Sequence, residues 1–259
     1  LYGDFQFNID PSSDNFLTRG ICSFYVPVET ARPVIKEERR LSKADWKRLL
    51  YLAHTDKAEA FRQYQEFYLS TSGQLYWSDT HQLSIYLDDY HEELDRALGA
   101  KCPGSEMISE LYVPRENLGA FLAEVAGDFR RHEVDLIYGT VRFIEKDEVS
   151  YLAWAKQAYA CVIFNLHTDH HPAGIERSRR AFQRLIDIAI SYGGSYFLTY
   201  HRFARRDQVL AAYPQFPAFL AEKERHDPEN LIQSDWHRHY RAMFQAGENA
   251  PRPLACSIP

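Results

Sequence analysis

The chain has 259 residues, of which 45% are hydrophobic and 25% are charged, so it is long enough for one large domain or two small ones. Its formal net charge is −6 and it has no long block of lysine and arginine, which argues against a nucleic-acid partner. Its apolar runs fall far short of the ~20 residues that span a bilayer, and its start is polar, so we expect no membrane insertion and no signal peptide.

Two strand-like segments open the chain. Residues 2–9 alternate aromatic and polar side chains, and residues 20–28 form a second apolar run that stops at prolines. Turn-forming residues join the two. We expect residues 1–30 to be the end of a preceding domain, and the chain to be a piece cut from a longer protein.

The next part, residues 31–104, is predicted to be a helical region. Ser42 is a suitable N-cap for a first helix, and apolar residues recur at helical spacing in residues 57–71. Residues 74–98 have a helical or irregular pattern that Gly99 closes.

Residues 105–240 show a regular succession of elements. Strands are predicted at 107–113, 136–145, 159–167 and 195–201, with a helix that begins at Pro114 and another at 175–192. The order β-α-β-β-α-β is that of the ferredoxin-like unit, an α+β fold whose antiparallel sheet carries helices on one face. Additional helices are predicted at 206–212 and 216–226. Residues after Asp227 look irregular, with a tail at 241–259.

Four short blocks in this region carry a family resemblance. They are SEMISELYVPRENLGAF (105–121), YGTVRFIEKD (138–147), GGSYFLTYHRF (193–203) and DPENLIQSD (227–235). In this order they resemble the substrate, or cap, domain of FAD-linked oxidases of the vanillyl-alcohol oxidase type, such as the sugar-lactone and alditol oxidases. The resemblance covers roughly residues 105–240, with weaker support from residues 1–30.

The resemblance implies one part of a flavoenzyme. In that family an N-terminal domain holds FAD, and this chain has no glycine-rich phosphate loop of its own. It therefore implies a partner, the FAD-binding domain of the full-length protein, of which residues 1–30 would be the end. The implied reaction is hydride transfer to the flavin from a small molecule that carries a hydroxyl group. The chain alone is expected to be inactive.

The resemblance also implies roles for individual residues. Arg142 matches a strand arginine that would stabilise reduced, anionic flavin or bind a substrate oxygen. His201 is the candidate base or hydrogen-bond donor for the substrate hydroxyl. Tyr200 is a further catalytic candidate, as a hydrogen-bond donor, and stands near a position where several family members carry lysine, a departure that leaves the substrate class open. Glu110 and Thr199 would bind substrate, and Asn230 would join Arg142 at the flavin.

Strand alternation adds two more substrate-binding candidates. In residues 159–167, Cys161, Ile163, Asn165 and His167 fall on one face. Polar residues that end an apolar strand often face a cavity, which favours Asn165 and His167 as substrate contacts. The alternative is that both bind backbone groups at a strand end.

Two other functions stay open. One alternative is a zinc or iron metallohydrolase that uses HTDHH (167–171), which resembles half of a binuclear motif. No His-x-His precedes this segment, so we assign no metal ligand to it. With 17 Tyr and 16 Phe, the chain could instead be a non-catalytic binding module with an aromatic pocket. The four cysteines are scattered without a CxxC pair, which predicts free thiols in a reducing, cytoplasmic compartment.

Overall fold

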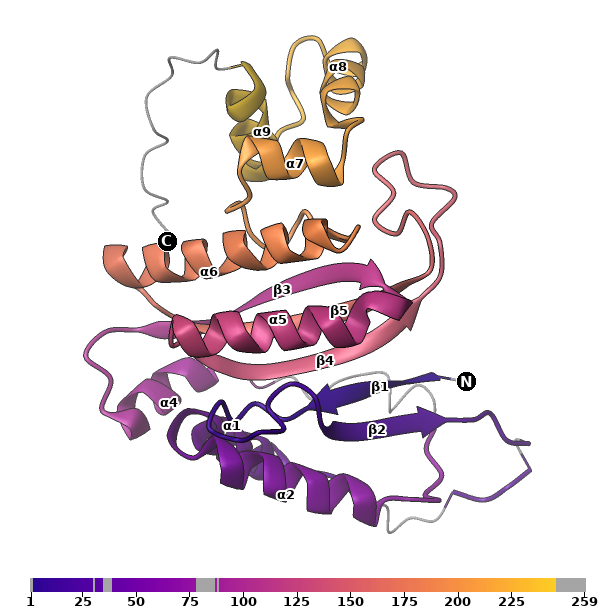
Figure 1. The fold of residues 1–259 in the computed structure, drawn as a ribbon, viewed down its shortest axis with the longest axis vertical. Coiled ribbons are helices and arrows are strands. Elements are labelled where there is room, and N and C mark those ends of the chain that lie inside the picture. The colour runs from indigo at the N-terminus through magenta and orange to yellow at the C-terminus, as the bar shows by residue number, and fades with distance from the viewer. Residues whose placement is uncertain (1, 30, 35–38, 78–86, 88, 246–259) are drawn as a thin grey trace. The chain divides into compact units, whose positions relative to one another are not determined.

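The elements follow one another in the α+β order that the sequence predicts. The computed structural model describes residues 2–29, 31–34, 39–77, 87 and 89–245. The described strands and helices are β1 (Tyr2–Phe7), β2 (Gly20–Tyr25), α1 (Lys43–Thr55), α2 (Lys57–Ser70), α4 (Tyr90–Leu98), β3 (Gly104–Pro114), a short 3₁₀ turn (Arg115–Asn117), α5 (Leu118–Arg131), β4 (Leu136–Ile144), β5 (Tyr159–Asp169), α6 (Pro172–Ser191), β6 (Ser195–Tyr196), α7 (Arg206–Ala212), α8 (Phe216–His226) and α9 (Asp235–Gln245) (Figure 1).

Six strands form one sheet in the order β2-β1-β4-β5-β3-β6. The pairs β1–β2, β1–β4 and β3–β6 are antiparallel, with Phe5 opposite Val141 and Leu111 opposite Tyr196. The central pair β5–β3 lies between β4 and β6, which is the strand order of a ferredoxin-like β-α-β-β-α-β unit. The predicted α+β, ferredoxin-like sheet is therefore confirmed, and β1 and β2 extend it beyond β4.

The chain divides into two compact units that interleave along the sequence. Unit 1 comprises residues 1–107, 122–142 and 163–170, and unit 2 comprises residues 108–121, 143–162 and 171–259. The strands β3, β4 and β5 contribute residues to both. The boundaries predicted at residues 30, 104 and 240 do not coincide with those of the units.

The core of unit 1 contains phenylalanines from β1, β5 and α5. Phe7 lies directly over Gly139, where an added Cβ would meet the Phe7 ring at 2.1 Å. The Phe164 ring lies 5.6 Å from that of Phe7 and 5.4 Å from that of Phe129 on α5. Since Phe164 is fully buried, α5 covers the face of β5 on which the even-numbered side chains lie.

The other helices of unit 1 are held by caps and by a lysine. Ser42 caps α1 in a capping box with Asp45, as predicted. Helix α1 packs against both α2 and α4 (Figure 1). At the start of α2, Lys57 Nζ donates to Asp135 Oδ1 at 2.9 Å and to the carbonyl oxygen of Leu136 at 2.7 Å, which ties the helix to the start of β4.

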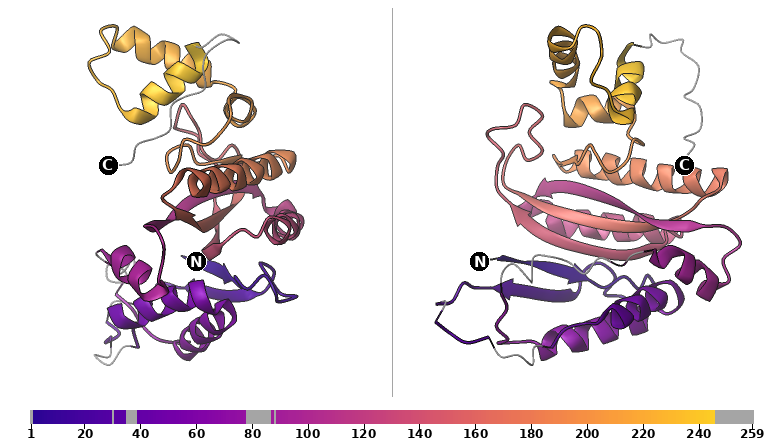
Figure 2. Two further views of the ribbon diagram at one scale, coloured as in Figure 1. Left: turned by 90° about the vertical axis from the view of Figure 1, so that its left-hand side faces the viewer. Right: turned by 180° about the vertical axis from the view of Figure 1, so that it is seen from behind.

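In unit 2, helices α7, α8 and α9 form a group at the C-terminal end of the described chain (Figure 2). Phe216 is fully buried at its centre, with ring centroids 5.7 Å from Trp236 and 5.1 Å from Tyr240. Trp236 Nε1 donates to the carbonyl oxygen of Leu198 at 2.9 Å, which attaches the group to the segment after β6. Among the described residues, no helix combines the length and the apolar character that crossing a membrane requires.

Two predicted elements differ from the structure. The predicted strand 195–201 is regular only at Ser195–Tyr196, and the amide of Phe197 makes one more bond to the Glu110 carbonyl, at 2.9 Å, before the chain turns. The prediction of a strand that extends to His201 is therefore wrong, and Thr199 and His201 lie beyond its end. The region after residue 227, predicted to be irregular, contains helix α9, which includes 241–245 of the predicted tail; residues 246–259 of that tail lie outside the described residues.

Candidate functional site

The first candidate site is a carboxylate on strand β3 in unit 2. Glu110 Oε1 accepts a hydrogen bond from the Tyr112 hydroxyl at 3.0 Å and one from Cys161 Sγ at 2.9 Å. Glu110 and Tyr112 lie two residues apart and so share one face of β3. Cys161 reaches the same carboxylate from β5. The site therefore presents one half-buried carboxylate that two donors on neighbouring elements hold in place.

Two aromatic rings pack against Tyr112, one of the donors to this carboxylate. The Tyr112 ring stacks on that of Tyr159, with centroids 6.2 Å apart, and the Trp154 ring lies edge-on at 5.6 Å. Burial, followed by the nearby charge of Glu110, raises the pKa of the Tyr112 hydroxyl. That hydroxyl therefore stays protonated and available as a donor.

His201 lies on the opposite side of β3 from Glu110. Its Nε2 is 3.3 Å from Ser109 Oγ, and Ser109 precedes Glu110 and so faces the other way. The His201 ring packs against Phe182 of α6, with centroids 4.3 Å apart, and only 5% of the residue is exposed. Burial lowers the pKa of His201 to about 4, so the ring is neutral near pH 7. The structure does not bring His201 to the carboxylate.

The remaining predicted residues do not gather around either carboxylate described in this section. Arg142 is exposed on β4 in unit 1. Thr199 and Tyr200 are exposed in the turn after β6. Asn165 is half-buried on β5, on the same side of the strand as His167, as the alternation predicted. Asn230 lies in the loop after α8 with a left-handed backbone, φ 54°.

The second candidate site is a buried cluster in unit 1 around Glu106 of β3. Glu106 Oε1 lies 3.2 Å from His54 Nε2 of α1 and 3.4 Å from His167 Nδ1 of β5. The other oxygen, Oε2, accepts from the Tyr90 hydroxyl at 2.5 Å and lies 3.2 Å from His91 Nδ1, both at the start of α4. Three elements thus bring side chains to one carboxylate on β3.

This cluster favours an ionised carboxylate beside imidazole rings. Burial opposes ionisation of Glu106, but hydrogen bonds from His167, His54 and Tyr90 together outweigh it and hold the pKa of the carboxyl well below its usual range. The hydrogen bond to Glu106 raises the pKa of His167, against the effect of burial. The side chains of His54 and Glu106 are each 5% exposed, whereas those of His167 and His91 are 19% and 38% exposed, so the carboxylate is buried and the two outer histidines reach solvent.

A glycine makes room for the His167 ring. A Cβ added to Gly104 would meet His167 Cε1 at 2.4 Å, closer than real Cβ contacts come. The amide of Gly104 also donates to Asp95 Oδ2 at 3.1 Å, which fixes the start of β3. A side chain at position 104 would therefore displace His167 from Glu106.

The histidines of the HTDHH segment have different partners. His170 Nε2 lies 2.8 Å from Ser105 Oγ, and His171 Nδ1 accepts from the amide of Gly174 at 3.1 Å as the cap of α6. Only His167 takes part in the Glu106 cluster, whose partners come from distant parts of the chain. Spacing within the segment could not have indicated His54 or Tyr90. The sequence gives Glu106 no distinctive signal, because it precedes the predicted strand 107–113 and β3 also carries Ser105, Ser109 and Glu110.

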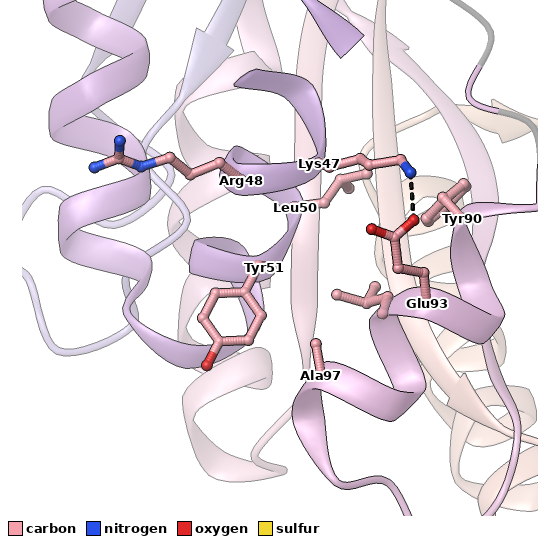
Figure 3. Close-up of a pocket in the computed structure, with 8 residues that line it drawn as sticks. Lys47, Arg48, Leu50, Tyr51, Tyr90, Glu93 and Ala97 are labelled. Atoms are coloured by element: carbon pink, nitrogen blue, oxygen red, sulfur yellow. Dashed lines mark hydrogen bonds and ion pairs between the residues drawn. The ribbon is translucent and has the colours of Figure 1, made fainter. Parts of the chain in front are cut away.

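A pocket of about 230 Å³ lies between α1 and α4 in unit 1 (Figure 3). Its lining includes Leu50 and Tyr51 of α1 and Tyr90 and Ala97 of α4, and an ion pair between Lys47 and Glu93 joins the two helices beside it. Because Tyr90 both lines the pocket and donates to Glu106, the pocket ends next to the buried cluster.

No protein-family model and no curated protein matches the chain.

Proposed function

We propose that this chain is the substrate-binding part of an FAD-dependent oxidoreductase that oxidises a hydroxyl-bearing small molecule. The proposal rests on the resemblance of the four sequence blocks and on one structural observation. That observation is the group of Glu110, Tyr112 and Cys161 on the face of β3 away from His201 and α6. Glu110 is only partly buried, so its carboxylate, held by two donors, can orient the hydroxyl of a bound substrate.

FAD would supply the hydride acceptor, and the residues of this chain would orient the substrate and handle its proton. In this proposal the Glu110 carboxylate accepts the hydrogen bond of the substrate hydroxyl and takes its proton as the hydride leaves. Tyr112 and Cys161 keep that carboxylate in place. His201, the base that the resemblance suggested, is less suited to the role because its ring is enclosed between Ser109 and Phe182.

The experiment is performed on the protein encoded by the complete reading frame. We expect it to carry flavin absorbance, and a panel of sugars, alditols and aryl alcohols to bleach it anaerobically. Glu110→Gln should retain the flavin spectrum but lower kcat/KM by about 10- to 100-fold, which corresponds to loss of a hydrogen bond to a charged group worth ~1.5–3 kcal/mol. Ser109→Ala, the adjacent residue on the other face, serves as the control and should change kcat/KM little.

Two results would contradict the proposal. One is a purified protein without flavin that gains no flavin absorbance when FAD is added. The other is a flavoprotein whose kcat/KM is insensitive to Glu110→Gln. The cytoplasmic location stays a prediction, consistent with the free thiols of Cys22, Cys102 and Cys161.

A further inference from the structure

The cluster around Glu106 has the composition of a metal site. His54, Glu106 and His167 each offer one ligand atom, and these three atoms all lie within 4.8 Å of one another. Two imidazoles and one carboxylate form the ligand set of several catalytic zinc centres and of non-haem iron centres. The three residues come from α1, β3 and β5, so the fold, and not a local run of sequence, brings them together.

The distances in the cluster suit a tetrahedral ion. Ligand atoms that each lie about 2.1 Å from zinc at a tetrahedral angle are about 3.4 Å apart. Glu106 Oε1 lies 3.2 Å from His54 Nε2 and 3.4 Å from His167 Nδ1. The ligand atoms of all three residues lie within 4.8 Å of one another, and tetrahedral binding requires the two histidine nitrogens to be about 3.4 Å apart.

The residues around these three side chains also match a metal centre. Metal-bound histidines usually direct their second ring nitrogen to a carboxylate or carbonyl, and metal-bound carboxylates are hydrogen-bonded in turn. His167 Nε2 lies 3.7 Å from Asp169 Oδ1. The second carboxylate oxygen of Glu106, Oε2, accepts a hydrogen bond from the Tyr90 hydroxyl at 2.5 Å. A hydrogen bond between a histidine and a carboxylate does not by itself require a second carboxylate such as Asp169 or a hydroxyl donor such as Tyr90.

We propose that His54 Nε2, Glu106 Oε1 and His167 Nδ1 bind one divalent transition-metal ion, for which Zn²⁺ fits best. The mixed nitrogen and oxygen donors and the tetrahedral spacing favour Zn²⁺ over Mg²⁺ or Ca²⁺, which prefer all-oxygen shells. With three protein ligands, one coordination position stays open for water or an exogenous ligand. The site is separate from the flavin-dependent reaction proposed for Glu110 and does not depend on it.

The first test is equilibrium dialysis of the metal-free full chain against Zn²⁺, with elemental analysis. We expect one zinc per chain. His54→Gln, Glu106→Gln and His167→Gln should each weaken zinc binding by at least about 100-fold, and Tyr90→Phe, which removes an outer hydrogen bond, by about 10-fold. His132→Gln is the matched control, because His132 lies on the surface beside Asp128 and takes no part in the cluster.

The second test needs no substitution and so remains decisive if a variant fails to fold. Co²⁺ bound to the wild-type chain should give the intense visible bands of a tetrahedral site. Long-range ¹H–¹⁵N spectra recorded during a Zn²⁺ titration should show that His54 Nε2 and His167 Nδ1 are the nitrogens that lose their protons. Zinc bound with less than one equivalent per chain would overturn the proposal. So would zinc binding that survives all three ligand substitutions but is lost in His170→Gln or His171→Gln.

Discussion

The Nε2 atom of His54 lies 3.2 Å from Oε1 of Glu106 and so joins helix α1 to strand β3 across 52 positions of the chain. Both side chains are almost fully buried. A buried carboxylate is stable only when donors compensate for its lost hydration, and here His167 and Tyr90 supply further donors. The same contacts that could hold a metal ion therefore also stabilise unit 1.

The stability of unit 1 should depend on the charge of Glu106. Glu106→Gln replaces an oxygen acceptor with an amide donor that faces histidine and tyrosine donors. We expect it to lower the free energy of unfolding by about 2–3 kcal/mol, in the range for a hydrogen-bonded buried charge. Urea denaturation of the metal-free protein measures the effect.

Glu93→Gln is the matched control for this substitution. Glu93 pairs with Lys47 at the surface, and 61% of its side chain is exposed, so its loss should cost less than about 1 kcal/mol. If the two substitutions had equal effects, the Glu106 network would contribute no more than a surface ion pair.

Gly104 should be intolerant of any side chain. Gly104→Ala places a methyl group 2.4 Å from His167 Cε1, so either the ring or the strand has to move. We expect a loss of about 1–3 kcal/mol, typical of overpacking a filled site. In a double-mutant cycle, adding His167→Ala should recover most of the loss caused by the methyl group.

Gly119→Ala is the corresponding control. No atom lies within 4 Å of a Cβ at this exposed position in α5, so the substitution should stabilise the protein by roughly 0.5–1 kcal/mol. If the losses of stability caused by Gly104→Ala and His167→Ala were additive, Gly104 would not be needed to make room for the His167 ring.

Local sequence patterns predicted much of the fold because their physical causes are local. Helices α7 and α8 begin and end where their patterns predicted, and the capping box at Ser42 starts α1. Residues 159–167 were predicted as a central strand because they are almost wholly apolar, and β5 does lie between β4 and β3. Helix α9 was missed although its signals are present, since Ser234 Oγ accepts from the amide of His237 as an N-cap does.

The candidate sites were less predictable because they depend on contacts between distant residues. Glu110 was a candidate from the resemblance, but its bond to Cys161 depends on the pairing of elements 51 positions apart. His54 looked like an ordinary helix residue. The predicted strand 195–201 does not reach His201, because it ends at Tyr196, where the Tyr213 hydroxyl donates to the Tyr196 carbonyl.

The stability of the group of α7, α8 and α9 should depend on the ring of Phe216. Phe216 contacts Trp236, Tyr240 and Phe244, with the last centroid 5.3 Å away, and has no exposed surface. Phe216→Ala should therefore lower the free energy of unfolding by about 3–5 kcal/mol, because the rigid rings around it cannot move in to fill the cavity. Hydrogen exchange should show loss of protection in α8 and α9.

Leu231→Ala tests whether this effect belongs to the cluster. Leu231 lies in the loop between α8 and α9 and is 78% exposed, so its truncation should change stability by less than about 0.5 kcal/mol. Comparable losses for the two variants would mean that the helices do not rely on Phe216.

Stability should fall with acidification because of His201. Burial lowers its pKa in the folded protein to about 4, whereas in the unfolded chain the imidazole has its ordinary pKa of 6.5. As the pH falls from 6.5 toward 4, the unfolded chain takes up a proton at His201 and the folded protein does not. The contribution of His201 to stability is therefore fully present above pH 6.5 and decreases by roughly 3 kcal/mol across this window.

Comparison with His201→Phe isolates this contribution from those of other groups that titrate in the same range. Phenylalanine preserves the packing of the ring against Phe182 and Phe203, with centroids 4.3 and 5.3 Å away, but it cannot bind a proton. The free energy of unfolding of the variant, measured by urea denaturation at several pH values, should fall less steeply below pH 6.5 than that of the wild type. Parallel curves would mean that His201 titrates alike in the folded and unfolded chains, and hence that its ring is hydrated in solution.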